Sequence, residues 1–412
     1  MSTILITDAR IAARSGTVDH GWLLAVDGRI AKHGPGAPEP AAITAVEEAS
    51  TATVINAAGQ WLMPGFIDVH VHGALGHEAM DGSVDGLAQM AGFYAQHGVT
   101  GFLATTWTGS HDETVDALRG VAQGMDQVEG GARIFGAHME GPYLNPERCG
   151  AQDKALIRRA TPEEVDTFFS IGAVRLITVA PEIEGSLDLI DECHRRGIAV
   201  SAGHTDATYA QMAQAVPHGV QHVTHTFNAM RPLHHREPGV IGAAMTMSEL
   251  SVELIADNVH VHPVIMDALL NARGTGAVVL VTDAMRATGM PTGEYAVGDR
   301  QAFKYDGAVR LANGALAGSV LTMDAALRNF QQATKATLGD LWATTSGNAA
   351  RLAGVADRTG AIAAGLDADL VIVDDEVRVS HTIVEGRVVH RSGNRSTVPV
   401  PPNTISASGG RN

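Results

Sequence analysis

The chain has 412 residues, of which 45% are hydrophobic and 18% charged, so a large apolar core can form and general disorder is excluded. The net charge of -16 argues against a nucleic-acid surface, because affinity for polyphosphates comes from many Lys and Arg side chains. A small anionic substrate is still compatible, since one or two local cations bind it. With Cys149 and Cys193 as the only cysteines, a disulfide framework and a Cys-rich zinc module are excluded.

The sequence shows no targeting or membrane segment. Its N-terminus lacks the basic region and the long apolar run of a signal peptide. No stretch approaches the roughly 20 uninterrupted apolar residues of a transmembrane helix. We therefore expect a cytoplasmic protein that binds neither membranes nor nucleic acids.

The first 61 residues have the composition of short strands joined by turns. Segments 4–12 and 22–34 are strand-like, and Asp27-Gly28 is a dipeptide typical of a tight hairpin turn. Residues 34–53 are rich in Pro, Ala and Glu and predict a loop.

Between residues 62 and 354, eight short apolar runs alternate with segments of helical periodicity. The runs are apolar throughout, as expected of parallel strands that are buried on both faces. Eight such units predict an α/β fold, a (β/α)₈ TIM-type barrel, with a doubly wound sheet as the alternative. The predicted strands are 66–73, 99–106, 133–141, 174–182, 198–205, 221–228, 251–261 and 277–285.

Helix signals and a second strand-rich segment complete the prediction. Thr161 followed by Pro162 and two glutamates is a typical helix start. The last helices are expected at about 322–352. Residues 355–393 again read as short strands, and we expect them to pair with residues 1–61 in a small β-sandwich domain flanking the barrel. The tail, 394–412, is rich in Ser, Pro and Gly and is predicted to be disordered.

Polar residues able to bind metal occur near the ends of six predicted strands. Active sites of such barrels lie at the carboxyl ends of the strands, whereas an unpaired polar side chain within a strand would be buried at a cost. These residues are His70, His72, Glu140, His204, His225, His260 and Asp283.

Spacing adds chemical detail to this set. His70 and His72 are two residues apart, so on a strand both imidazoles point the same way and can reach one ion. Asp283 ends the eighth strand, where a carboxylate can move a proton beside a metal-activated water. A helix N-cap is the alternative for Asp283. We expect His222 to be structural, because it is three residues from His225 and faces the other way, and His138 can lie behind the metal ligands.

Motifs along the chain resemble the amidohydrolase superfamily. PGFIDVHVHG at 64–73 and RTGAIAAGLDADLVIVD at 358–374 carry this likeness. Seven further motifs in order resemble the N-acetylglucosamine-6-phosphate deacetylase family over nearly the whole chain. They are MEGPYLN (139–145), AGHTDAT (202–208), THTFNAM (224–230), REPG (236–239), ADNVHV (256–261), LVTDA (280–284) and LAGSVLTMD (316–324).

The resemblance implies a role for each matching residue. Glu140, His204 and His225 would hold the main divalent metal, and Asp283 would be the proton shuttle. His70 and His72 would give the capacity for a second metal bridged by Glu140. A histidine that polarises the substrate carbonyl in some members is replaced here by Gln152. The implied substrate ligands are His260 and Arg236 for the phosphate, with Arg236 reaching across a homodimer, and Ala151, Asn228, Ala229, Leu316, Ala317, Gly318 and Ser319 for the sugar.

The resemblance also implies the reaction, which is hydrolysis of the acetamide of N-acetylglucosamine 6-phosphate in amino-sugar catabolism. One or two divalent ions per subunit are expected; zinc is the first choice, and iron, manganese or cobalt would suit the same ligands. The alternatives are another hydrolase of the superfamily, similar to dihydroorotases or deaminases, and a non-catalytic barrel that serves as a scaffold. The Glu140 position and the Arg-Glu-Pro-Gly loop favour the deacetylase.

Overall fold

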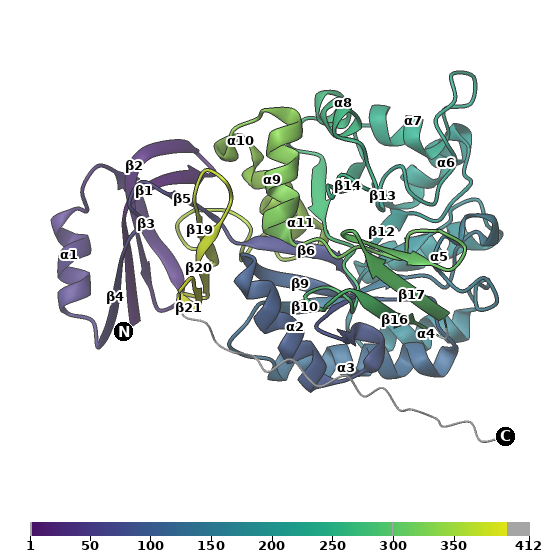
Figure 1. Cartoon of the computed structure of the whole chain (residues 1–412), viewed down its shortest axis with the longest axis horizontal. Helices are drawn as coiled ribbons and strands as arrows, with labels where there is room; N and C mark the ends of the chain where they lie inside the picture. Colours follow the sequence, from purple (N-terminus) through teal and green to yellow (C-terminus); the bar gives the residue numbers. More distant parts are fainter. Residues whose placement is uncertain (1, 299, 394–412) are drawn as a thin grey trace.

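The computed structural model describes residues 2–298 and 300–393 (Figure 1). The predicted disordered tail, 394–412, lies outside the described residues. Two large sheets dominate the fold: one is formed by both ends of the chain, and the other is a barrel of parallel strands.

The barrel contains the eight predicted strands in chain order, each parallel to the next, which confirms the (β/α)₈ prediction. Nearly all of their residues are buried, because helices cover the outside and side chains fill the inside. The strands are β6 (Phe66–Val71), β9 (Val99–Thr106), β10 (Arg133–Glu140), β11 (Val174–Val179), β12 (Ala199–Ala202), β13 (Val220–Val223), β14 (Ser251–Ile255) and β15 (Val278–Val281).

Helices surround the barrel strands in the alternating order of the sequence (Figure 1). The predicted start at Thr161 is confirmed, since its hydroxyl accepts a hydrogen bond from the backbone N–H of Glu164 at 3.3 Å. The helices are α2 (Val84–Gln96), α3 (His111–Gln127), α4 (Pro162–Ser170), α5 (Ser186–Arg196), α6 (Tyr209–His218), α7 (Gly239–Thr246), α8 (Pro263–Arg273), α9 (Met323–Thr334), α10 (Leu338–Trp342) and α11 (Asn348–Leu352).

The first and last barrel strands meet at the mouth through backbone hydrogen bonds that lie just beyond β15. The N–H of Asp283 donates to the carbonyl of His70 at 2.8 Å, and the N–H of His72 donates to the carbonyl of Ala284 at 2.8 Å. These bonds join β6 to the segment that follows β15, so they bring candidate site residues together where the barrel closes.

The chain ends form one mixed sheet beside the barrel, in the order β21-β20-β19-β5-β1-β2-β3, with β4 paired to β1. It encloses an apolar core of its own, to which both ends of the chain contribute. The pairing of N- and C-terminal segments is thus confirmed. The strands are β1 (Ser2–Ala13), β2 (Gly16–Val26), β3 (Arg29–Pro35), β4 (Thr51–Asn56), β5 (Trp61–Pro64), β19 (Leu370–Val373), β20 (Val379–Val384) and β21 (Arg387–Arg391).

Two local predictions in the N-terminal segment had different outcomes. The hairpin at Asp27-Gly28 is confirmed, with φ of 46° and 82° at these residues, as the favoured two-residue turn requires. The predicted loop at 34–53 is wrong, because helix α1 (Pro40–Glu47) and the start of β4 lie there. Ala42 of α1 packs against Trp22 and its neighbours in the sheet, and this tertiary contact outweighs the loop-like composition.

A three-stranded antiparallel sheet between β15 and α9 was not predicted. It consists of β16 (Gly293–Val297), β17 (Arg300–Tyr305) and β18 (Ala308–Leu311). Its apolar face packs with Trp107, Ala151 and Met285, residues that belong to the barrel mouth. The sheet therefore lies against the end of the barrel where the candidate site is located. A short hairpin, β7 (Gly73–Ala74) and β8 (His77–Glu78), follows β6.

Candidate functional site

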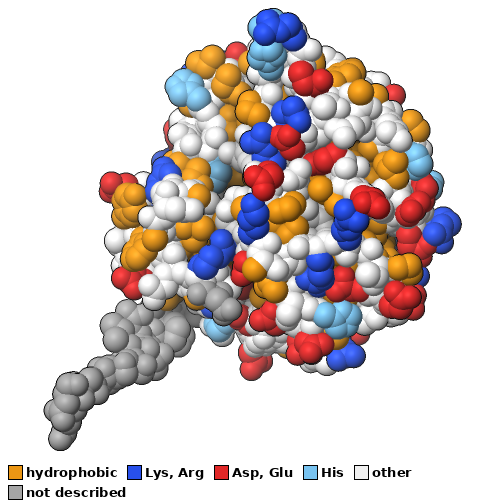
Figure 2. Space-filling view, turned by 90° about the vertical axis from the view of Figure 1, so that its right-hand side faces the viewer, with side chains coloured by type: hydrophobic (Ala, Val, Ile, Leu, Met, Phe, Trp, Pro, Cys, Tyr) orange, Lys and Arg blue, Asp and Glu red, His pale blue; other side chains and the backbone are white. Residues whose placement is uncertain are grey.

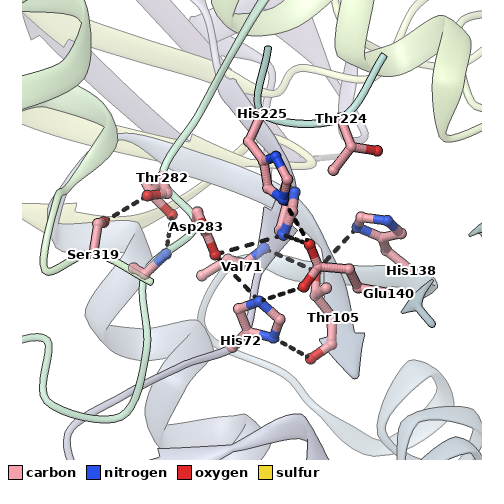
Figure 3. A network of polar contacts seen from close by, with 12 residues as sticks. Val71, His72, Thr105, His138, Glu140, Thr224, His225, Thr282, Asp283 and Ser319 are labelled. Atoms are coloured by element: carbon pink, nitrogen blue, oxygen red, sulfur yellow. Dashed lines mark hydrogen bonds and ion pairs between the residues drawn. The ribbon is translucent and has the colours of Figure 1, made fainter. Parts of the chain in front are cut away.

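Four imidazoles converge on the carboxylate of Glu140, the last residue of β10; Figure 3 shows His72 and His225 beside it. The Nε2 atoms of His204 and His225 each lie 3.0 Å from its Oε1. Nε2 of His72 lies 3.3 Å from Oε2, and Nε2 of His70 lies 3.5 Å from Oε1. All five side chains are at most 5% exposed. The structure thus brings together the five residues that the sequence singled out as metal ligands.

Hydrogen bonds at the opposite ring nitrogen orient three of these imidazoles. Nδ1 of His70 pairs with Glu253 at 2.8 Å, Nδ1 of His72 with the carbonyl of Thr105 at 3.2 Å, and Nδ1 of His204 with the carbonyl of Arg148 at 2.8 Å. A carbonyl can only accept, so Nδ1 of His72 and His204 carries a proton, and Nε2 is the ring atom that faces the site. This arrangement is typical of metal-binding histidines.

The donor atoms fit divalent metal ions in two groups that share Glu140: one with His70 and His72, the other with His204 and His225. Within residues 2–298 and 300–393, Nε2 of His70 and of His72 is buried and meets no hydrogen-bonding partner in good geometry. The two Nε2 atoms of His204 and His225 are 3.1 Å apart. An ion at ~2.0–2.1 Å from its ligands imposes donor separations of roughly 3.0–3.4 Å.

The electrostatics of the site favour bound cations. Burial by itself would raise the pKa of the Glu140 carboxyl, but the imidazoles of His70 and His204 outweigh it and hold the pKa well below its usual range. Burial lowers the pKa of His72, but its contacts with Asp283 and Glu140 outweigh this effect and raise the pKa to about 9. The buried carboxylates therefore demand positive charge nearby, which protons or metal ions can supply.

Backbone conformation places three site residues over the barrel mouth. His204, His225 and Asp283 each lie two residues beyond the end of their strand, with φ of 48°, 27° and 50°. This left-handed region is sparsely populated for residues other than glycine, although His and Asp tolerate it better than most. Such conformations cluster at functional sites, where the surrounding structure holds them.

Asp283 faces the metal-binding groups and not a helix start. Its Oδ1 lies 3.2 Å from Nε2 of His72 and 3.5 Å from Nε2 of His70 (Figure 3). Its side chain is 10% exposed and lines a cavity of about 180 Å³. This contact with both the ligands and the cavity suits the predicted proton-transfer role. The cavity is lined by Trp107, Glu140, Gly150, Ala151, His204, His225, Asn228, Ala229, His260, Asp283, Ala315, Leu316 and Gly318.

Four predicted substrate residues lie outside the described lining of this cavity. Gln152 is buried beneath it and donates from Nε2 to Oε2 of Glu140 at 2.6 Å. Ala317 packs in the apolar cluster of the three-stranded sheet, and the hydroxyl of Ser319 donates to the carbonyl of Thr282 at 2.6 Å. Arg236 is exposed, and its guanidinium contacts His235 at 2.8 Å.

His260 lies at the cavity wall, as predicted for a substrate ligand. Its Nδ1 pairs with the carboxylate of Asp257 at 2.6 Å, which leaves Nε2 available. Burial raises the pKa of Asp257, but the hydrogen bond with His260 outweighs it, and the net pKa is lowered. Asp257 therefore stays ionised and holds the His260 ring in place.

Two further histidines lie behind the ligands. His222 pairs with Ser251 at 2.7 Å and with Glu253 at 3.2 Å, outside both metal-binding groups. The His138 ring packs against His70 in a T-shaped arrangement, with ring centroids 4.7 Å apart, and its Nε2 pairs with Thr178 at 2.8 Å.

Sequence reasoning missed two residues that contact the ligands. The Trp107 ring stacks on His72, with centroids 3.7 Å apart and an interplanar angle of 7°. Glu253 binds His70 from the middle of β14. The signal for Glu253 was a single carboxylate in an apolar strand, which is costly unless it is fully hydrogen-bonded.

The second groove and the surface shown in Figure 2 are less suited to catalysis than the barrel mouth. A larger groove of about 1030 Å³ lies at the opposite end of the barrel, and its described lining has arginines and carboxylates but neither histidine nor cysteine. On the face shown in Figure 2, acidic and basic side chains are interspersed. In the part of the chain that the structure describes, every helix is too short or too polar to cross a bilayer.

Comparison with known proteins gives the family. The model of the Amidohydrolase family matches residues 61–389. N-acetylglucosamine-6-phosphate deacetylase of Bacillus subtilis is 36% identical over 394 residues, which cover 94% of this chain and 97% of the relative. N-acetylgalactosamine-6-phosphate deacetylase of Escherichia coli O157:H7 is 35% identical over 380 residues, 92% of this chain and 98% of the relative.

A solved structure agrees with this result. It is a mutant N-acetyl-D-glucosamine-6-phosphate deacetylase from Mycobacterium smegmatis in complex with N-acetyl-D-glucosamine-6-phosphate. It is 31% identical, with a TM-score of 0.86, and the match covers 94% of this chain and 100% of the other. By sequence and by fold, the chain belongs to the amidohydrolase family, in the branch of the N-acetylglucosamine-6-phosphate deacetylases.

Proposed function

We propose that the chain is a metal-dependent hydrolase that cleaves the acetamide of N-acetylglucosamine 6-phosphate into acetate and glucosamine 6-phosphate. The convergence of four imidazoles and Asp283 on Glu140 at the barrel mouth carries this proposal. Membership of the deacetylase branch supports the choice of substrate.

Glu140, His204 and His225 would hold the main divalent ion, and His70 and His72 would hold a second one with Glu140. Imidazole and carboxylate ligands suit zinc first, and also iron, manganese or cobalt. When bound, the ion supplies Lewis acidity, which produces a hydroxide nucleophile near neutral pH and polarises the acetyl carbonyl.

Asp283 would move the proton. It accepts the proton of the attacking water and later delivers it to the departing amine, which is otherwise a very poor leaving group. Its contact with His72 and its position in the cavity lining support this role. Gln152 donates one N–H to Glu140. The second N–H of this amide would stabilise the developing oxyanion only if it reached the cavity that Gln152 lies outside, and it cannot give up a proton.

Phosphate binding would fall to His260 and to Arg236 of the partner subunit in a homodimer. The planar guanidinium suits a phosphate because it donates two parallel hydrogen bonds. The cavity of about 180 Å³ is smaller than the roughly 300 Å³ of ordinary ligand pockets, which supports a site that a second subunit completes. Asn228, Ala229, Ala151 and the 316–319 segment would contact the sugar.

One experiment tests this function: acetate release from a panel of N-acetylated sugars, with metal content measured on the same preparation. We expect rapid release from N-acetylglucosamine 6-phosphate, slower release from N-acetylgalactosamine 6-phosphate and very slow release from the unphosphorylated sugar. A preparation with stoichiometric metal that leaves every acetamide intact would exclude the deacetylase, and a preparation without metal or activity would favour the scaffold.

A further inference from the structure

Glu253 is a fully buried carboxylate whose two oxygens accept three hydrogen bonds. It lies between Val252 and Leu254 in the middle of β14 and is 0% exposed. Oε2 accepts from Nδ1 of His70 at 2.8 Å and from the backbone N–H of His225 at 2.9 Å. Oε1 pairs with Nε2 of His222 at 3.2 Å. An ionised side chain at this depth persists only because each of its contacts is a hydrogen-bond donor.

The bond to His70 sets the direction in which this imidazole acts. Because Nδ1 donates to Glu253, the lone pair of Nε2 points to the other side of the ring, where Glu140 and Asp283 lie 3.5 Å away. Without this acceptor, the ring could exchange its tautomer or rotate, and Nε2 would no longer be presented to the site.

The bond to His225 acts on the other metal-binding group. His225 has left the strand and has φ of 27°, so a contact is needed to hold its backbone there. Oε2 of Glu253 binds its N–H, and the backbone carbonyl of Glu253 accepts from the N–H of Thr226 at 3.1 Å. One residue of β14 therefore holds the start of the loop that carries His225.

His222 keeps the Glu253 carboxylate in place. Its ring is 0% exposed, and each of its nitrogens has a partner: Ser251 at 2.7 Å and Glu253 at 3.2 Å. His222 thus spans β13 and β14 and supports Glu253 from the side away from the ligands.

We propose that Glu253 is a positioning residue that couples the two metal-binding groups, through the side chain of His70 in one and the backbone of His225 in the other. This inference rests on the metal assignment of the proposed function. It concerns how the metal ligands are held and not the reaction itself. The affinity of the protein for metal is therefore the direct measurement of this role.

Two substitutions separate positioning from simple electrostatic attraction. Glu253→Asp keeps the charge but withdraws the oxygens by one methylene from His70 and His225. Glu253→Gln keeps the reach and an acceptor for both, while its amide N–H can donate to His222. Positioning predicts that Glu253→Asp weakens metal affinity by about 10–100-fold, the usual effect of losing such a partner, and that Glu253→Gln stays within a few-fold of the wild type.

Asp369→Asn is the matched control. Asp369 is another buried acid, and its contacts with Arg133, Thr359 and the backbone of Glu385 involve no member of the metal-binding groups. The affinity of each metal-free protein for zinc is measured by competition with a chelator, and the more weakly held ion is compared if two bind. The absorption spectrum of the cobalt(II) form reports the ligand geometry, and thermal unfolding of the metal-free protein reports folding.

The expected result is weak binding and an altered cobalt spectrum for Glu253→Asp alone. Wild-type affinity in Glu253→Asp would overturn the proposal, and so would a loss in Glu253→Gln as large as that in Glu253→Asp, because charge would then matter more than reach. Acetate release by the wild type tests the proposed function separately from the role of Glu253. A wild type that binds metal but leaves N-acetylglucosamine 6-phosphate intact would refute the proposed function without deciding the role of Glu253.

Discussion

The amide of Gln152 bonds directly to the carboxylate of Glu140, with Nε2 2.6 Å from Oε2, while its Oε1 accepts from the backbone N–H of Thr108 at 2.7 Å. Gln152→Leu would leave the buried N–H of Thr108 without an acceptor, so we expect the free energy of unfolding to fall by about 1–3 kcal/mol. Urea unfolding of the metal-free protein measures this change. Gln96→Leu, at an exposed glutamine of α2, is the control, and equal stability of the two variants would contradict the prediction.

Asp283→Asn removes the proton acceptor while keeping the shape of the side chain. We expect kcat for N-acetylglucosamine 6-phosphate to fall by about 10²–10⁴-fold, the range typical of general acid–base catalysis, with metal still bound. Acetate release and metal content on one preparation test this. Asp112→Asn changes an exposed acid at the start of α3 and should behave as the wild type. Near-normal turnover by Asp283→Asn would show that another group moves the proton.

Arg236→Ala should raise KM for the phosphorylated sugar by about 10–100-fold, the equivalent of losing ~1.5–3 kcal/mol of charge-assisted hydrogen bonding. Its activity on the unphosphorylated sugar should stay unchanged. If Arg236 acts across a dimer, mixing Arg236→Ala with Asp283→Asn should give more activity than either variant alone at substrate concentrations well below the KM of Arg236→Ala, because one site of each mixed dimer has both residues. An unchanged KM, or a mixture as inactive as its parts, would place Arg236 elsewhere.

Glu164 of α4 predicts a pH-dependent contribution to stability. Burial raises its pKa, but the hydrogen bonds from Arg158 at 2.8 Å and from Tyr143 at 2.9 Å outweigh it and lower the pKa below 4.5. A lowered folded-state pKa means that this stabilisation is complete above the unfolded-state pKa and is lost as the pH falls through the folded-state value.

Glu164→Gln should therefore lower the free energy of unfolding at neutral pH by about 1–3 kcal/mol and flatten its decline as the pH falls below the unfolded-state pKa of a glutamate. Urea unfolding of the metal-free protein across this range is the measurement. Glu163→Gln, at the exposed neighbouring position, serves as the control. A parallel decline in Glu164→Gln and the wild type would show that other carboxylates dominate acid unfolding.

The barrel could be predicted because each of its strands is a short apolar run buried on both faces, a pattern that composition alone displays. Helix α1 could not be predicted in this way. Its segment is loop-like in composition and becomes helical because Ala42 packs against Trp22. In the sheet β16–β18 only β16 has alternating burial, and the three short strands did not stand out between β15 and α9.

The metal-binding residues were predictable because polar side chains at strand ends are unusual and the parallel strands bring them to one edge. The direction in which a side chain points within a loop could not be predicted from the sequence. Leu316 and Gly318 line the cavity, whereas Ala317 and Ser319 turn away from it, and only the tertiary fold decides this. Glu253 was hidden for a different reason, since its function depends on β6 and β13, which are distant in sequence.

The hydrogen bond from the N–H of Asp283 to the carbonyl of His70 is also the closure of the barrel at its mouth. The seam between the first and the eighth strand therefore contains the acid that would transfer the proton. Local opening of this seam would separate Asp283 from His72 while most of the barrel stays folded. On heating, catalytic activity should then be lost at a lower temperature than helical structure. The temperature of inactivation would be set by the backbone pairing between β6 and the segment after β15.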